Sequence, residues 1–125
     1  MISFFINFYR FCKLVFIGIK KDTEFRYLFF FLSILLTSST IFYNKIEHWE
    51  VVDSLYFSVM TMATVGYGDF VPTHNISKIF TIIYTFLSIG TFVAFTAKIV
   101  QFTLQKDNQK TPLGKLTSKF KNKNQ

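Results

Sequence analysis

Six consecutive residues, Thr64 to Asp69 (TVGYGD), have the composition needed to bind a cation through the main chain. In an extended strand, successive carbonyl groups point to opposite sides. Consecutive carbonyls face one side when alternate residues adopt left-handed dihedrals, which glycine enters without penalty. Gly66 and Gly68 stand at alternate positions. We therefore expect four carbonyl oxygens to face one axis and replace the water around a cation, and the Thr64 hydroxyl can add a ligand at the inner end. These carbonyls belong to Thr64, Val65, Gly66 and Tyr67.

Two long apolar runs flank this segment. No residue is charged from Tyr27 to Asn44 or from Ile79 to Ala97, which gives runs of 18 and 19 residues. About 20 residues of helix cross a bilayer, so each run is long enough to span one. Half of the 125 residues are hydrophobic and a fifth are aromatic, which is too apolar for an ordinary soluble domain. We expect an all-α membrane protein with an outer helix at about 25–43 and an inner helix at about 78–104. A buried core helix is the alternative for the first run.

The segment between the two spans must enter the membrane and return. Residues 54–63 (SLYFSVMTMA) predict a helix of ten residues, and Asp53 can cap its free amides. Ten residues are too few to cross a bilayer. A non-helical return leaves backbone groups unpaired, which is tolerated at membrane depth only inside protein or beside water. Because one chain with two spans cannot enclose a water-filled cavity, we expect several copies to surround it.

The charge distribution predicts the topology. Residues 1–26 carry five basic and two acidic side chains, residues 45–78 carry two basic and four acidic ones, and residues 98–125 carry seven basic and one acidic. By the positive-inside rule, both termini are expected in the cytoplasm and the link outside. The net charge of +7 does not indicate a nucleic-acid partner, because the cations flank hydrophobic spans and do not form a folded basic face.

The two terminal segments are both candidates for contact with membrane lipid. Residues 1–22 are predicted to form an amphipathic interfacial helix, since their polar side chains recur every three, four or seven positions. A helix packed on protein is the alternative. Residues 105–125 are polar and lysine-rich, which predicts a disordered cytoplasmic tail. The basic residues of both segments are suited to anionic lipid.

The string TVGYGD resembles the selectivity-filter signature of potassium channels. The segments TIFYNKIE and LYFSVMTMATVG are similar to the NaK channel, a minimal two-helix prokaryotic member of that family. The resemblance implies two transmembrane helices with a reentrant pore helix at 54–63 and a filter at 64–69, assembled as a homotetramer. It also implies potassium ions as the permeant ligand and no cofactor. The NaK channel is non-selective and has aspartate where Tyr67 stands, so Tyr67 implies the potassium-selective form.

The resemblance further assigns roles to individual residues. It implies that Thr64, Val65, Gly66, Tyr67 and Gly68 form the ion-binding filter. Tyr56 and Asp69 match an aromatic residue and an aspartate whose hydrogen bond stiffens the filter from behind.

The inner span contains a candidate gate. Gly90 can act as a hinge, or it can permit close packing against a neighbouring helix. Helices of the resembled family usually carry the hinge glycine about two positions earlier, where Ser88 stands. Hydroxyl side chains form a stripe that either faces the ion path or bonds back to its own helix, at Thr81, Thr85, Ser88 and Thr91. The resemblance instead turns Phe92 and Thr96 toward the lower cavity.

These observations lead to one hypothesis and two alternatives. We expect passive potassium conduction across the cell membrane through a tetrameric carbonyl-lined filter. The alternatives are a weakly selective monovalent cation channel, as in the NaK channel, and a non-conducting regulatory membrane subunit. The sequence contains no nucleophile, base and orienter set and no catalytic metal motif, so an enzyme is not expected.

Overall fold

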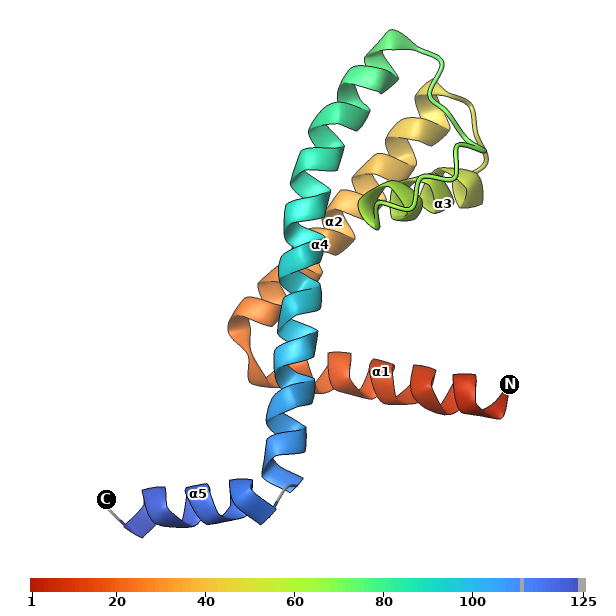
Figure 1. The fold of residues 1–125 in the computed structure, drawn as a ribbon. Helices are drawn as coiled ribbons and strands as arrows, with labels where there is room; N and C mark the ends of the chain where they lie inside the picture. The colour runs from red at the N-terminus through yellow and green to blue at the C-terminus, as the bar shows by residue number, and fades with distance from the viewer. Residues whose placement is uncertain (111, 124–125) are drawn as a thin grey trace. The chain divides into compact units, whose positions relative to one another are not determined.

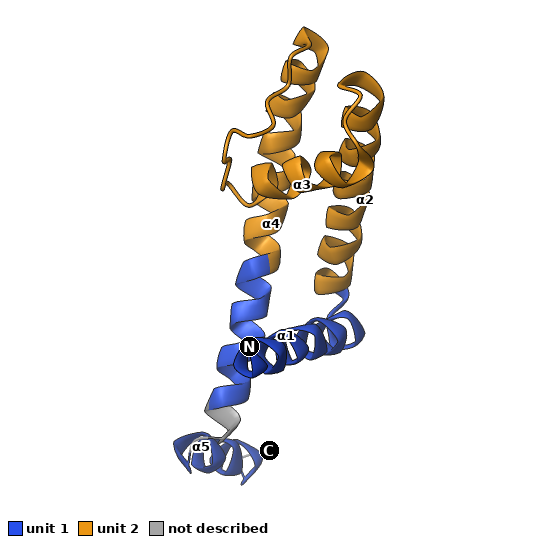
Figure 2. Ribbon diagram, turned by 90° about the vertical axis from the view of Figure 1, so that its right-hand side faces the viewer, with its two compact units in different colours: residues 1–23, 96–125 blue, residues 24–95 orange. Residues whose placement is uncertain are grey.

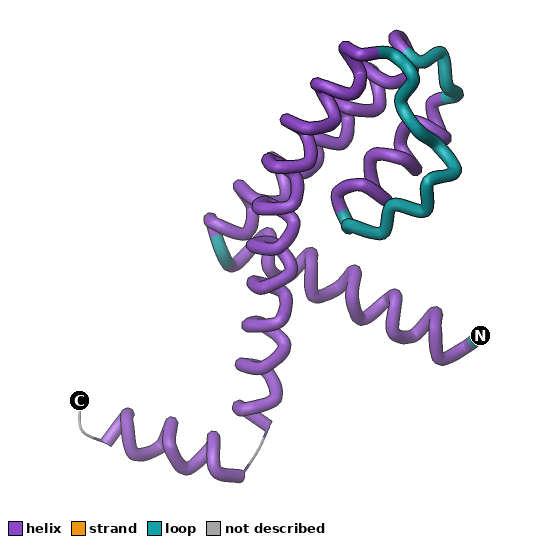
Figure 3. The backbone as a smooth tube through the Cα atoms, turned by 45° about the horizontal axis from the view of Figure 1, so that its top comes forward, coloured by secondary structure: helices purple, strands orange, loops and turns teal. Residues whose placement is uncertain are grey.

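The computed structural model describes residues 1–110 and 112–123 (Figure 1). Within these residues the chain is helical and has no strand, which confirms the all-α fold class. The helices in chain order are α1 (Ile2–Lys21), α2 (Thr23–Ile46), α3 (Val51–Met62), α4 (Asn75–Lys110) and α5 (Pro112–Lys123). The short α3 and the loop that follows it, residues 63–74, lie between the two long apolar helices α2 and α4 in the sequence (Figure 3).

The chain divides into two compact units, shown in different colours in Figure 2. Unit 2 contains residues 24–95, and unit 1 contains residues 1–23 and 96–125. Three of the described helices are long and apolar enough to cross a membrane: α1, α2 and residues Asn75–Asp107 of α4. Helix α3 is apolar but has only 12 residues.

Small hydroxyl residues hold the three helices of unit 2 together. The fully buried Ser39 on α2 donates a hydrogen bond to Ser58 Oγ on α3, over 2.8 Å. The hydroxyl of Tyr84 on α4 donates to the carbonyl oxygen of Ser58, over 3.1 Å. Small residues allow helices to approach closely, and a hydroxyl bond between helices satisfies polar groups that hydrocarbon would leave unpaired. Ser58 therefore positions α3 against both long helices.

Aromatic rings complete the packing of unit 2. Phe42 on α2 stacks on Phe80 on α4, with ring centroids 3.9 Å apart. The fully buried Tyr43 contacts Phe57 on α3 edge to face at 4.8 Å, and its hydroxyl lies 2.6 Å from Thr81 Oγ1 on α4. Such edge-to-face and stacked pairs add to the free energy gained by burying the rings. The core of unit 2 therefore lies where α2, α3 and α4 meet.

Helix α3 begins earlier than the sequence suggested. Its first residue is Val51, and its N-cap is Glu50, which makes no side-chain capping bond. The predicted cap at Asp53 is wrong, because the extended backbone at Glu50 (ψ 155°) lets the first turn start three residues before Ser54. Asp53 lies in that first turn instead, where its charge still favours the positive end of the helix dipole.

Unit 1 brings the end of α1 against the last part of α4. Lys98 Nζ on α4 lies 3.3 Å from Asp22 Oδ2, directly after α1. The backbone N–H of Asp22 also donates to the carbonyl oxygen of Gly18 and ends α1. Gly18 is buried.

The structure describes helix where the sequence predicted a disordered tail. Residues 105–110 continue α4, and 112–123 form α5. Pro112 occupies the first position of α5, which suits its fixed φ angle and missing N–H. Leu113, Leu116 and Phe120 then repeat at helical spacing and form an apolar face among the lysines. Three residues of the predicted tail lie outside the described residues: Thr111, Asn124 and Gln125.

Candidate functional site

The TVGYGD segment (residues 64–69) alternates in backbone handedness. Positive φ angles occur at Thr64 (60°), Gly66 (52°) and Gly68 (78°), and at no residue between them. The glycines lie where the sequence placed the left-handed dihedrals, but Thr64 was not anticipated, because a β-branched residue rarely adopts this conformation. A Cβ at Gly66 or Gly68 would meet nothing within 4 Å. Glycine is therefore required at these two positions because of the backbone conformation, since a single chain leaves enough room for a side chain at both.

The backbone amides of this segment are hydrogen-bonded at its start, whereas its backbone carbonyls are not. The amide of Thr64 donates to the carbonyl of Thr61, and the amides of Val65 and Gly66 both donate to the carbonyl of Met60 at the end of α3. Among the described residues, no backbone N–H donates to the carbonyl oxygens of residues 64–68. The end of α3 thus accepts hydrogen bonds from the first amides of the TVGYGD segment. The carbonyl groups of the segment itself remain free to bind an electropositive ligand.

The TVGYGD segment is exposed on the single chain. Every residue from 64 to 69 is exposed. Val65 retains 47% of its accessible surface and Tyr67 retains 72%. The rest of unit 2 therefore leaves these two large side chains largely uncovered. Exposed backbone acceptors and exposed large side chains at one place are typical of a surface completed by further protein.

The side chains expected to support the segment are brought together. The hydroxyl of Tyr56 on α3 lies close enough to the Asp69 carboxylate to interact with it. A cavity of about 170 Å³ separates α3 from the segment and is lined by both, including Met60, Gly66 and Tyr67. Asp69 also lines this cavity, so the residue that interacts with Tyr56 borders the space between α3 and the segment.

Two further aromatic residues support the segment and were not predicted. Phe70, directly after Asp69, contacts the rings of Trp49 and Tyr56 edge to face, at centroid distances of 5.2 and 6.2 Å. Trp49 also contacts Phe57 at 5.3 Å. Nothing in the spacing of Trp49 in the sequence indicates that the residues after α2 fold back onto the TVGYGD segment.

Glu47 was not among the site residues predicted from the sequence. Its side chain is 1% exposed and accepts hydrogen bonds from the amides of Thr73 and His74, each over 3.1 Å. The Thr73 hydroxyl donates to the same carboxylate over 2.7 Å. Glu47 therefore satisfies amides immediately before the first turn of α4, where a negative charge is favoured.

This environment sets the protonation state of Glu47. Burial by itself would raise its pKa, but the hydroxyls of Ser77 and Thr73 and the backbone amides of His74 and Thr73 outweigh burial and lower the pKa to about 2. The carboxylate is charged at neutral pH, so it links the end of α2 to the start of α4 as an anion.

The candidate gate residues lie within an uninterrupted part of α4. The helix continues through Ser88 and Gly90. Ser88 is fully buried within unit 2, and its hydroxyl donates to the carbonyl of Thr85. A Cβ on Gly90 would meet nothing within 4 Å, so packing inside one chain does not require glycine there.

The hydroxyl stripe of α4 bonds back to its own helix. Thr81, Thr85 and Thr91 each donate to the carbonyl oxygen four residues earlier, and Ser88 donates to the carbonyl three residues earlier. These bonds favour the interpretation that the hydroxyl stripe bonds back to its own helix over the one in which it faces the ion path, because the hydroxyl protons are used within the helix.

Known proteins share this arrangement of helices and loop. A family model described as ion channel matches residues 30–105. A solved structure of a calcium-activated cation channel from Tsukamurella paurometabola is 36% identical, with a TM-score of 0.62, and the match covers 69% of this chain and 84% of that chain. A structure named as a calcium activated non-selective cation channel gives 36% identity, a TM-score of 0.61 and the same coverage. Two pore potassium channel a of Oryza sativa subsp. japonica is 38% identical over 57 residues, which are 46% of this chain and 16% of that protein.

The chain therefore belongs to this ion-channel family. The resemblance to potassium channels drawn from TVGYGD is confirmed by this family membership and by the plant relative. It follows that the chain is a membrane protein and that its TVGYGD segment occupies the part of the matched region between the two apolar helices.

Proposed function

We propose that the chain forms a homotetrameric, potassium-selective channel that conducts passively down the electrochemical gradient. In this assembly Thr64, Val65, Gly66 and Tyr67 contribute rings of carbonyl oxygens around a central axis, with Gly68 closing the outer end. The Thr64 hydroxyl adds a ligand at the inner end. Both termini are in the cytoplasm, and the α3–α4 loop opens to the outside.

One observation carries the proposal: alternating left-handed residues in a segment whose first amides bond to α3 and whose carbonyls bond to no backbone donor. A row of free carbonyls on one face of a strand can replace the hydration shell of a monovalent cation. Free backbone acceptors at membrane depth are tolerated only where they line a cavity inside protein. Several copies around an axis supply both conditions.

Selectivity is tested with the purified chain in liposomes that contain no other protein. A reversal potential measured with potassium on one side and sodium on the other should lie close to the potassium equilibrium potential. Potassium flux should be abolished by Gly66→Ala, because alanine at φ 52° strains the backbone of every copy. Gly114→Ala is the matched control, since Gly114 lies within helix α5, outside the TVGYGD segment and the candidate gate, and its φ is not positive.

A weakly selective cation channel is the second candidate, and the structure named as a calcium activated non-selective cation channel, at 36% identity, favours it. A reversal potential near zero in the same experiment would select this candidate. No flux at all from a correctly assembled protein would instead support a non-conducting regulatory subunit.

A further inference from the structure

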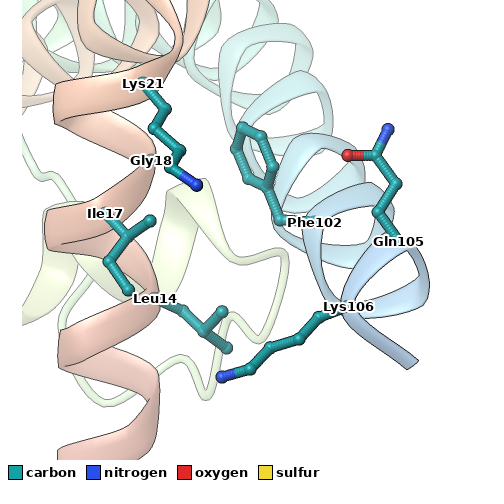
Figure 4. A pocket seen from close by; sticks show the side chains of 7 residues that line it. All are labelled: Leu14, Ile17, Gly18, Lys21, Phe102, Gln105 and Lys106. Atoms are coloured by element: carbon teal, nitrogen blue, oxygen red, sulfur yellow. The ribbon is translucent and has the colours of Figure 1, made fainter. Parts of the chain in front are cut away.

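A hollow between two helices of unit 1 combines an apolar floor with a cationic rim. The hollow has a volume of about 340 Å³ and lies between α1 and the last part of α4. A smaller hollow of about 130 Å³ adjoins it and shares Leu14, Ile17 and Lys106 with it. Figure 4 shows Lys21 and Lys106 reaching into the space from the two opposite helices. Phe102 faces α1 from α4 beside them.

The charges around these two hollows are unbalanced. Their linings contain four cations and one carboxylate, Asp107. The cations are Arg10, Lys13, Lys21 and Lys106, so positive side chains outnumber the carboxylate in the lining. Like charges facing each other across a hollow repel, and a bound anion removes that repulsion. The hollow is therefore complementary to a negatively charged group.

The apolar part of the lining shows what else the ligand must contain. Leu14 and Phe102 are half-buried and leave apolar surface in the hollow, beside Ile17. The exposed surface of α1 also includes Phe4 (70% exposed) and Phe8 (57% exposed), which need an apolar environment. A small inorganic anion would satisfy the cations but leave the apolar floor against water.

We propose that this hollow binds one anionic phospholipid. Its phosphate lies between Lys21 and Lys106, with Arg10 and Lys13 extending the positive field, and its acyl chain covers Leu14, Ile17 and Phe102. Basic pockets between membrane helices bind phospholipid headgroups by this combination of charge and apolar contact. The site concerns unit 1 alone and does not depend on which cation the chain conducts.

Binding is tested by native mass spectrometry of the full chain in mild detergent. The probes are phosphatidylglycerol and phosphatidylcholine with identical acyl chains. Phosphatidylglycerol should be retained in preference to phosphatidylcholine. Lys21→Gln with Lys106→Gln should weaken its retention by roughly thirtyfold, since each cation near an anionic lipid contributes about a fivefold factor. Equal retention of the two lipids would overturn the proposal.

The matched control is Lys119→Gln with Lys121→Gln on α5. This pair removes the same charge from residues that do not line the hollow, so it should change retention by less than about twofold. An equal loss in both double variants would show a diffuse charge effect and contradict the site. Ile17→Trp fills the hollow without changing its charge and should also reduce phosphatidylglycerol retention. Each variant is first checked by size exclusion for unchanged assembly.

Two further measurements need no variant. Phosphatidylglycerol retention by the unaltered protein should fall as salt is raised, because ionic contacts are screened; salt-independent retention would contradict the proposal. Glycerol phosphate, which carries the charge without the acyl chains, should not displace the lipid at equal concentration. Displacement at that concentration would assign the hollow to a free phosphate and overturn the lipid. Ion flux enters neither measurement, so a chain that binds lipid and does not conduct would refute only the proposed function.

Discussion

At the scale of single residues, Thr64 is held in a conformation that costs free energy. A left-handed backbone at a non-glycine residue costs about 1–2 kcal/mol, and a β-branched side chain rarely adopts it. The cost is offset locally, because the amide of Thr64 bonds to Thr61 and the next two amides bond to Met60. The carboxyl end of α3 therefore sets the handedness with which the TVGYGD segment starts.

The interaction between Tyr56 and Asp69 gives a prediction about ion selectivity. Tyr56→Phe removes the hydroxyl that interacts with the Asp69 carboxylate and leaves the ring in its contact with Phe70. Because the carboxylate loses a polar partner, the segment should loosen and the potassium over sodium permeability ratio should fall. Reversal potentials in mixed salts measure the ratio.

The control for this change is Tyr27→Phe. Tyr27 is 69% exposed and lies near the start of α2, so the same loss of a hydroxyl should leave permeability unaltered. If Tyr56→Phe and Tyr27→Phe gave the same permeability ratio as the unaltered chain, the interaction between Tyr56 and Asp69 would have no part in selectivity.

Glu47 predicts a pH dependence of stability. Its folded pKa of about 2 lies below the ordinary value of 4.5, so the stabilisation is fully present above about pH 5 and is lost as the pH falls through about 2. Glu47→Gln should lower the free energy of unfolding by about 1–3 kcal/mol at pH 7, and the difference from the unaltered chain should shrink toward pH 2. Thermal unfolding in detergent, followed by circular dichroism, measures this difference.

Glu50→Gln is the control for the Glu47 prediction, since Glu50 is exposed and its side chain makes no capping bond. Its effect should stay within about 0.5 kcal/mol at every pH. A constant difference between the Glu47 variant and the unaltered chain from pH 7 to pH 2 would show that its charge does not stabilise the fold.

At the scale of elements, α3 is positioned by hydroxyl groups where a soluble domain would use large apolar side chains. Ser39 and Ser58 are fully buried, and their bond joins α2 to α3. Tyr84 joins α4 to the same turn of α3. Because α3 in turn engages the amides of the TVGYGD segment, the spacing between these helices fixes where the carbonyls lie.

A larger side chain at this contact should therefore separate α2 from α3. Ser39→Leu adds two heavy atoms to a fully buried contact and removes a hydrogen bond, which should lower the free energy of unfolding by about 1–3 kcal/mol. Ser38→Leu is the control, because the neighbouring Ser38 is exposed and is turned about 100° away from Ser39 around α2. Thermal unfolding of the two variants should differ accordingly, and equal melting temperatures would contradict a tight contact at Ser39.

The sequence predicted the elements of unit 2 well because their signals are local. Uncharged runs of 18 and 19 residues predict long helices, and Gly66 with Gly68 predicts alternating backbone handedness. Contacts between distant positions leave no such local signal. The bonds from Thr73 and His74 to Glu47 join residues 26 and 27 positions apart, and the Trp49–Phe70 contact joins residues 21 positions apart. Neither could be found from composition or periodicity.

At the scale of the whole molecule, one chain leaves its most important surfaces open. The TVGYGD segment is exposed from residue 64 to 69, and α4 leaves apolar side chains such as Ile82, Ile83 and Phe86 between 56% and 80% exposed. Exposed apolar surface of this extent is covered by lipid or by further copies of the chain. The second possibility agrees with the proposed tetramer.

The proposed assembly predicts a mass. In mild detergent, multi-angle light scattering corrected for bound detergent should give four times the chain mass of 14.7 kDa. Phe86→Asp, on the exposed face of α4, should reduce the assembled fraction because it places a charge in an apolar interface or in lipid. A protein mass of 14.7 or 29.4 kDa for the unaltered chain, twice the single-chain value in the second case, would refute the tetramer.

The open carbonyl row on each chain has a genetic consequence if the site is shared among copies. A defective copy, altered at Gly66 for example, would still present an intact Ser39–Ser58 contact and would co-assemble with normal copies. Every mixed complex would then contain at least one copy with a distorted TVGYGD segment. Expression of such an allele beside the normal one should suppress far more current than its share of the transcripts, whereas an allele that cannot assemble should be recessive.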